Sequence, residues 1–233
     1  MTNTTTISTL AGDSDFHAYR ALPAGTPKAA IVVIQEIFGV NAGIRRKCDT
    51  LAEAGYLAIA PDLFWRLERG IELDPDIEPQ LQQAFGYMNA FDQDKGIADI
   101  EATIRAARAE LGEGGKVGVV GYCLGGRLAF MTAARTDVDA SVGYYGVGID
   151  GLLGEKHAIA HPVLLHVPVE DHFVDKAAQA AMHAGLDDHP KVTIYDYAGE
   201  DHGFATEFGE RRSDASAKLA DERTAKFFIQ NLG

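Results

Sequence analysis

The sequence predicts an α/β fold, in which a mostly parallel central sheet of about eight strands is flanked by helices on both faces. Three observations support this prediction. Short branched apolar runs alternate with stretches of helical periodicity, glycine or proline punctuates the changes between them, and 46% of the 233 residues are hydrophobic. The chain shows no internal repeat and no interdomain linker. We therefore expect a single domain over residues 1–233.

Strands and helices are expected in regular alternation along the chain. Short apolar runs typical of strands occupy residues 16–23, 29–36, 56–61, 116–122, 140–146, 162–169 and 191–199. Helical spacing of apolar residues extends to about residue 54 after the loop 37–43, and recurs at 80–91, 95–111, 124–135, 174–186 and 216–232. A connection dense in charge and proline, 65–79, interrupts the alternation once.

The charge balance limits the classes of partner. The chain has 21 Lys and Arg against 34 Asp and Glu, a formal charge of −13, which argues against nucleic acid or an anionic membrane as a partner. No secretory signal or membrane-spanning run is visible, so we expect a cytoplasmic protein, monomeric or weakly homo-oligomeric, that acts on a small molecule. In a reducing compartment Cys48 and Cys123 are not expected to form a disulfide.

Cys123 lies in the segment GYCLG, residues 121–125, where a predicted strand meets a predicted helix. This pattern fits a nucleophile elbow, a turn so tight that glycines must flank the nucleophile. The amino-terminal end of the following helix favours a thiolate there. The alternative is a glycine-rich turn around a buried, inert cysteine.

The order of polar residues after Cys123 favours the catalytic interpretation. An elbow nucleophile is followed along the chain by an acid and then by a histidine. Two EDH segments, each just past a predicted strand, offer Asp171 as the acid and His202 as the base. Pairing His172 with Asp201 is the alternative, and it breaks the expected order.

Glu36 ends the apolar run 29–36 at the sheet edge where the elbow is expected. It is either a solvated loop charge or a carboxylate placed beside the nucleophile. The same loop is where elbow enzymes take the second amide of the oxyanion hole, while the residue after the nucleophile supplies the first. We therefore assign the oxyanion hole to the backbone amides of Ile37 and Leu124.

Neither a metal nor an organic cofactor is expected. His157, His161, His166 and His172 follow one another at short gaps, but Pro162 breaks any continuous ligand-bearing helix and no HExxH motif is present. The glycines around Cys123 do not fall as a dinucleotide-binding fingerprint.

Several blocks together resemble one family. The segments QEIFGVN, GYLAIAPDLF, GKVGVVGYCLGG, VGYYGVG and GEDHGFA are similar to those of the dienelactone hydrolases (carboxymethylenebutenolidases), cysteine enzymes of the α/β-hydrolase fold. The resemblance implies a triad of Cys123, Asp171 and His202, with Glu36 in contact with the resting thiol. It also implies opening of dienelactone, 4-carboxymethylenebut-2-en-4-olide, to maleylacetate through a thioester.

The chain departs from the family where the substrate carboxylate is expected to bind. Leu81 and Thr206 stand where two arginines would fall, and Arg127, Arg66 and Arg69 are possible substitutes. Aromatic side chains expected to line a more apolar pocket are Phe38, Trp65, Phe85, Tyr144, Phe173 and Phe204. The departure keeps two alternatives open. One is the same machinery acting on a less polar activated ester, lactone or thioester, and the other is a non-catalytic scaffold that binds a small ligand.

Overall fold

The computed structural model describes residues 3–233. The chain forms two compact units, the first ending at Gly118 and the second beginning at Val119. The boundary between them falls inside strand β5 (Val117–Tyr122), which is described below with the second unit. One domain over the whole chain stays a prediction.

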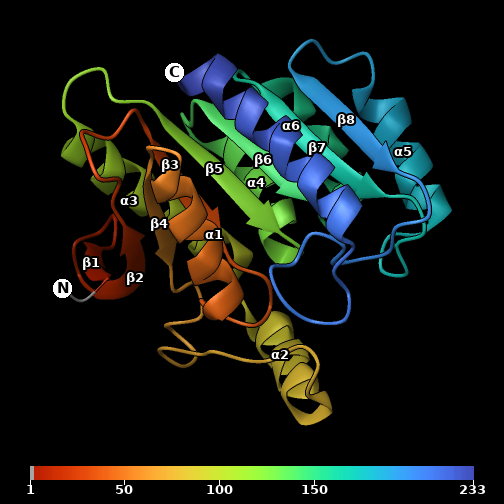
Figure 1. Ribbon diagram of the computed structural model, residues 1–233, viewed down its shortest axis with the longest axis horizontal. Coiled ribbons are helices and arrows are strands. Elements are labelled where there is room, and N and C mark those ends of the chain that lie inside the picture. Colours follow the sequence, from red (N-terminus) through yellow and green to blue (C-terminus); the bar gives the residue numbers. More distant parts are fainter. Residues whose placement is uncertain (1–2) are drawn as a thin grey trace. The chain divides into compact units, whose positions relative to one another are not determined.

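The first unit places four strands between two helices. Its strands are β1 (Thr4–Ser8), β2 (Asp15–Ala21), β3 (Ala30–Ile34) and β4 (Leu57–Pro61), in the order β1-β2-β4-β3. β3 and β4 are parallel, whereas β1 with β2 and β2 with β4 are antiparallel. Helices α1 (Ala42–Glu53) and α3 (Gln93–Leu111) contact the strands, one in front and one behind in Figure 1, and α2 (Glu78–Ala90) follows the long connection.

The second unit carries the elbow segment and both EDH segments. Its strands are β5, β6 (Ala140–Tyr144), β7 (Val163–Pro168) and β8 (Val192–Tyr197), in that order, with β6, β7 and β8 parallel. Helix α4 (Leu124–Arg135) packs on β6, α5 (Lys176–Leu186) on β8, and α6 (Asp214–Leu232) on β6 and β7 (Figure 1). A 3-10 helix, η1 (Asp150–Ala158), contacts α4 and α5.

Local sequence explains where the elements begin and which strands are buried. Asn41, Asp92 and Asp175 each accept a hydrogen bond from a backbone amide three residues further on, which caps the amino-terminal ends of α1, α3 and α5. Every residue of β5, β6 and β7 is buried, as their continuous apolar runs predict. The carboxyl ends of these strands are therefore rigid supports for the loops that follow.

The predicted helices and strands are present with boundaries shifted by a few residues, and the α/β class is confirmed. Two elements were missed. β1 has the polar sequence TTTIS and forms by antiparallel pairing with β2 at the sheet edge, a tertiary contact that leaves no apolar run in the sequence. η1 lies in a glycine-bearing segment without helical periodicity.

The two cysteines are free and buried. Burial raises the pKa of the Cys48 thiol far above its ordinary value, which agrees with a small core residue.

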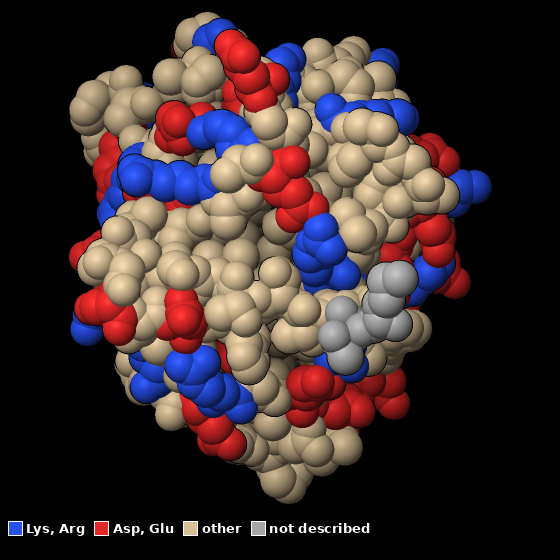
Figure 2. All heavy atoms as spheres, turned by 90° about the vertical axis from the view of Figure 1, so that its left-hand side faces the viewer, with Lys and Arg blue, Asp and Glu red and all other residues tan. Residues whose placement is uncertain are grey.

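Lys and Arg alternate with Asp and Glu on the face shown in Figure 2. Within residues 3–233, no helix combines the length and the apolar character needed to cross a bilayer.

Candidate active site

Cys123 occupies a sharp turn between β5 and α4. Its φ of 56° and ψ of −114° lie in a region that non-glycine residues rarely adopt. A Cβ atom on Gly121 would lie 1.9 Å from the carbonyl oxygen of Gly125, and one on Gly126 would lie 2.4 Å from that of Tyr144. Only glycine fits at these two positions, so the close approach of helix to strands depends on them. The turn has the backbone geometry of a nucleophile elbow.

The first turn of α4, which starts directly after Cys123, supplies backbone amide donors beside the elbow. The carbonyl oxygen of Cys123 accepts hydrogen bonds from the amides of Gly126 and Arg127, at 3.0 and 3.2 Å. Leu124 is the first residue of α4, and amides of a first helical turn are those that helices leave available for an anion. The predicted role of the Leu124 amide in an oxyanion hole stays a proposal.

Asp171 and His202 form a buried pair in the second unit. The carboxylate oxygens of Asp171 lie 2.9 and 3.1 Å from Nδ1 of His202. The two side chains are 0% and 1% exposed. Asp171 follows β7 and His202 follows β8, two neighbouring parallel strands, so the loops that carry them emerge side by side. A carboxylate on Nδ1 orients the ring so that Nε2 can act on a substrate or nucleophile.

Cys123 acts electrostatically on the same ring. Burial by itself lowers the pKa of His202, but the negative charge of Cys123 and the hydrogen bond with Asp171 outweigh it and raise the pKa to about 10. Nε2 is buried and has no hydrogen-bond partner among residues 3–233. The site therefore favours a protonated imidazole at His202.

Aromatic rings surround His202. Phe173, which is 43% exposed, and the buried Tyr145 both meet the imidazole edge to face, with ring centroids 4.8 and 5.0 Å away. Tyr145 has a φ of 40°, a strained value for a tyrosine. Phe204 packs on Tyr145 and Tyr197 in the core.

Tyr144, expected in the pocket, has a different environment. Its side chain is fully buried, and its hydroxyl bonds to Asp221 and Thr224 of α6 at 3.0 and 2.7 Å. We therefore assign the place beside His202 to Tyr145, which the sequence analysis missed. The available signal was side-chain alternation, since residues 144 and 145 of a strand end point to opposite sides.

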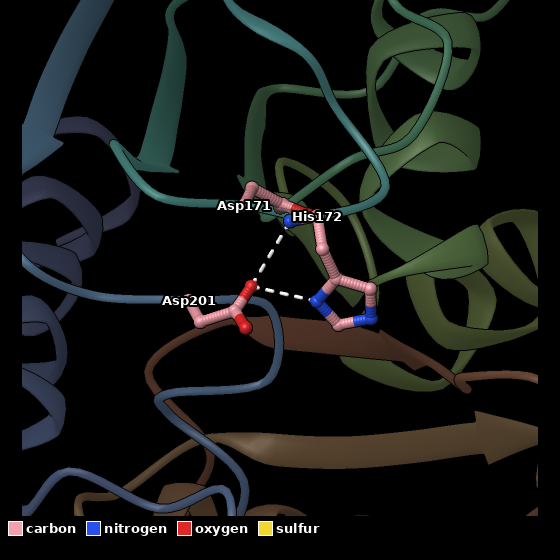
Figure 3. Close-up of side chains that lie close together, drawn as sticks. All are labelled: Asp171, His172 and Asp201. Atoms are coloured by element: carbon pink, nitrogen blue, oxygen red, sulfur yellow. Dashed lines mark hydrogen bonds and ion pairs between the residues drawn. The ribbon is translucent and has the colours of Figure 1, made fainter.

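His172 and Asp201 form a second pair, and Figure 3 shows their side chains beside Asp171. Nδ1 of His172 lies 2.8 Å from Oδ1 of Asp201, and both side chains are more than half exposed. The two EDH segments thus form both of the pairings considered. One is buried and the other is at the surface.

The same three residues place one ligand atom each within 4.8 Å of one another, a spacing that could hold a metal ion. The oxygens are already engaged, because Asp171 bonds to His202 and to the amide of Phe173, and Asp201 bonds to His172. His157, His161 and His166 belong to no such cluster of described residues. The expectation of a metal-free site stays a prediction.

The three arginines considered as substitutes are engaged elsewhere. Arg66 forms an ion pair with the buried Asp99, Arg69 donates to the carbonyl of Asp15, and Arg127 donates to the carbonyls of residues 147 and 148. Trp65 also donates to Asp99, at 2.9 Å.

Arg211, which the sequence analysis did not consider, approaches the catalytic loop. A Cβ atom on Gly203 would lie 3.1 Å from its Nη1 atom, so the guanidinium packs against the residue next to His202. Nearby in sequence, the hydroxyl of Thr206 is buried and has no hydrogen-bond partner among residues 3–233.

Five predicted site residues belong to the first unit. Glu36 and Ile37 follow β3 after one residue, Gln35, and are buried at 7% and 4% exposure. Phe38, the next residue, is also buried. Leu81 and Phe85 lie one turn apart on α2 and are half-buried. Their functional roles stay predictions.

A strand-to-helix elbow with a buried Asp–His pair after the later strands defines an α/β hydrolase. The chain belongs to the dienelactone hydrolase family, whose family model matches residues 16–232. A carboxymethylenebutenolidase of Pseudomonas putida is 42% identical over 216 residues, covering 91% of this chain and 92% of that protein. A protein of Azospirillum brasilense assigned as a carboxymethylenebutenolidase is 46% identical over 232 residues, covering 98% and 100%.

The solved structures agree with this assignment. A crystal structure of a Klebsiella pneumoniae protein assigned as a dienelactone hydrolase has a TM-score of 0.83 at 27% identity, and the match covers 97% of this chain and 98% of that one. The α/β-hydrolase fold expected from the sequence is confirmed, and the protein is a hydrolase.

Proposed function

We propose that this hydrolase opens an enol lactone of the dienelactone type to its keto acid, maleylacetate for dienelactone itself, with Cys123 as nucleophile. The observation that carries the proposal is the buried Asp171–His202 pair, whose imidazole pKa is raised to about 10 by Cys123 and Asp171 against the effect of burial. The names of the relatives, carboxymethylenebutenolidases, support the substrate class. A thiolate beside an imidazolium is ready to attack a carbonyl without prior deprotonation.

The first half-reaction forms a thioester. The sulfur of Cys123 adds to the lactone carbonyl carbon, and the carbonyl electron pair moves to oxygen, where the amides of Leu124 and Ile37 are proposed to stabilise it. The carbonyl then re-forms, the ring C–O bond breaks, and the enolate leaves. His202 gives its proton to the enolate, which becomes a ketone.

The second half-reaction restores the enzyme. Neutral His202 takes a proton from water, the oxygen of that water adds to the thioester carbonyl, and the Cys123 thiolate leaves. The net change is one lactone and one water converted to one keto acid. Asp171 holds Nδ1 of His202 throughout, so the same Nε2 atom serves as acid and then as base. Before substrate enters, a Cys123 thiol is proposed, from the sequence, to donate a hydrogen bond to Glu36. Substrate entry then shifts that pairing, the proton passes to His202, and Cys123 becomes the attacking thiolate.

The nucleophile type restricts the leaving group. A tetrahedral intermediate expels its better leaving group, and a thiolate leaves more readily than a simple alkoxide. An enolate is stabilised by delocalisation and competes well with the thiolate. Enol lactones and activated esters therefore suit Cys123, whereas amides and alkyl esters do not.

The deciding experiment follows hydrolysis of the carboxylated enol lactone by wild type and Cys123→Ala in EDTA buffer, with rapid-quench mass spectrometry of the wild-type protein. We expect turnover and a transient acyl group on Cys123 in wild type, and a loss of at least about a thousandfold in the variant. Unchanged turnover in Cys123→Ala would remove the proposed nucleophile. Binding without turnover in wild type would favour the non-catalytic scaffold.

Substrate selection gives a second test, centred on Arg211. Arg211 packs against Gly203, the residue that follows His202, and we propose that it binds a substrate carboxylate. We expect Arg211→Gln to raise KM for a carboxylated lactone about 10-fold or more and to leave a neutral lactone within about two-fold. An equal loss for both lactones would contradict a carboxylate-specific role. Faster wild-type hydrolysis of the neutral lactone would favour the less polar substrate.

Two further residues near His202 are proposed to contact the substrate. Thr206 is proposed to bond to the substrate, since its buried hydroxyl has no partner among residues 3–233. Phe173, which is 43% exposed and packs on His202, is proposed to cover the substrate. The cytoplasmic location and the oligomeric state expected above remain predictions.

A further inference from the structure

The two catalytic loops continue beyond the strands that support them. The parallel register of β7 and β8 ends at the pair Pro168 and Tyr197. Past that point two backbone hydrogen bonds join the loops, from the amide of Val169 to Tyr197 at 3.0 Å and from the amide of Glu170 to Glu200 at 2.8 Å. Asp171 and His202 come after these bonds, so their relative position needs a further connection.

One carboxylate oxygen makes that connection. Oδ1 of Asp201 accepts hydrogen bonds from two backbone amides, that of His172 at 3.0 Å and that of His202 at 2.6 Å. The same oxygen lies 2.8 Å from Nδ1 of His172. Figure 3 shows Asp201, on the loop after β8, pointing toward His172 on the loop after β7. The two amides belong to the residue after the catalytic acid and to the catalytic base itself.

We propose that Asp201 is a positioning residue. It fixes the loop of Asp171 to the loop of His202 by accepting hydrogen bonds from the backbone amides of His172 and His202. This inference rests on the proposed function for its effect on rate, but the contact itself concerns the protein alone. The amide of His172 is part of the peptide unit that follows Asp171, so holding it sets the direction of the Asp171 side chain. In the same way, holding the amide of His202 fixes the backbone position from which the imidazole extends.

The chemistry of a carboxylate suits this task. An ionised carboxylate oxygen accepts several hydrogen bonds, and bonds to a charged acceptor are stronger than neutral ones. Burial raises the pKa of Asp201, but hydrogen bonds with His172 and the two amides outweigh it, so its pKa lies below the ordinary value and the group is charged at neutral pH. The Nδ1 contact with His172 is exposed at the surface and adds little by itself.

The test compares Asp201→Ala with Asp201→Asn. Alanine removes the acceptor, and we expect kcat to fall roughly 10- to 100-fold with KM within about two-fold, since a small misplacement of catalytic groups has that cost. Asparagine keeps one acceptor oxygen and should recover kcat to within about five-fold of wild type, because the backbone contacts persist with a neutral partner. Asp196→Asn is a matched control, since Asp196 also contacts an exposed histidine, His183, at 3.2 Å.

A substrate-free measurement separates this proposal from the proposed function. Hydrogen exchange followed by NMR should show loss of protection at the amides of His172 and His202 in Asp201→Ala, with both amides unchanged in Asp196→Asn. If wild type fails to hydrolyse the lactone, the proposed function fails while the exchange result still decides the role of Asp201. Unchanged protection in Asp201→Ala, or a lower melting temperature with wild-type kcat, would overturn the positioning role.

Discussion

The two EDH segments build two Asp–His pairs from the same residue types, and the pairs differ in almost every physical property. Asp171 and His202 are 0% and 1% exposed, whereas Asp201 and His172 are 56% and 55% exposed. Each pair takes its acid from one loop and its histidine from the other. Hydrogen-bond distances in the two pairs are similar, 2.9 and 2.8 Å. Distance alone therefore does not distinguish the buried pair from the surface pair.

Burial and the neighbouring sulfur make the difference. The imidazole of His202 lies among Tyr145 and Phe173 and interacts with Cys123, so its charge is screened little by water. Its pKa is raised to about 10, although burial opposes that direction. The exposed pair has no nucleophile in contact, and its carboxylate instead bonds to backbone. The buried pair is suited to proton transfer by the His202 imidazole. The exposed pair is suited to joining the loop after β7 to the loop after β8 through the Asp201 carboxylate.

The largest expected effect separates the two histidines. His202→Ala removes the proposed acid and base and should lower kcat by about a thousandfold or more. His172→Ala removes an exposed ring that packs on Phe173 at 4.0 Å and meets His202 edge to face at 6.2 Å. The backbone amide that bonds to Asp201 remains, so kcat should stay within about three-fold. Steady-state hydrolysis of the same lactone measures both.

Circular dichroism and thermal melting serve as controls for folding in that comparison. The contrast is decisive only if both variants keep the wild-type spectrum. Equal losses for the two variants would show that the exposed ring takes part in the reaction, and the assignment of roles to the pairs would then be wrong.

Sequence reasoning was most accurate where the determinants are local. The elbow helix was predicted at residues 124–135, and α4 occupies Leu124–Arg135, because the valine-rich strand and the glycines around Cys123 mark where the helix begins. β1 was missed, because its polar residues become a strand only by pairing with β2. The triad order pointed to Asp171 and His202, and the structure places this pair in hydrogen-bond contact.

Other features of the site depend on tertiary geometry. Tyr144 and Tyr145 are adjacent in sequence, and side-chain alternation separates them without saying which one contacts His202. In the folded chain Tyr145 packs on His202, and the hydroxyl of Tyr144 bonds to Asp221. The engagement of Arg66 and Arg127 depends on partners that are 33 and about 20 residues away in sequence. Asp201 was weighed as one half of an alternative pair, whereas its backbone contacts appear only once the loops are in place. No sequence pattern predicts which side-chain oxygen accepts a hydrogen bond from which backbone amide.

The smallest expected effect is a difference in pH dependence between wild type and Cys123→Ala. The folded-state pKa of His202 is raised from 6.5 to about 10, so the protonated form stabilises the folded protein. That contribution is fully present below pH 6.5 and is lost as the pH rises through 10. Without the sulfur charge, the pKa of His202 in Cys123→Ala should fall.

Urea unfolding between pH 8.5 and 10.5, with NMR titration of the His202 ring, measures this difference. We expect wild type to lose about 1 kcal/mol more free energy of unfolding than Cys123→Ala over that range. His172→Ala should follow wild type, because the exposed pair has no contact with the sulfur. The same ring pKa in wild type and Cys123→Ala would mean that Asp171 alone sets the protonation of His202, and that the buried pair differs from the exposed one by burial without help from Cys123.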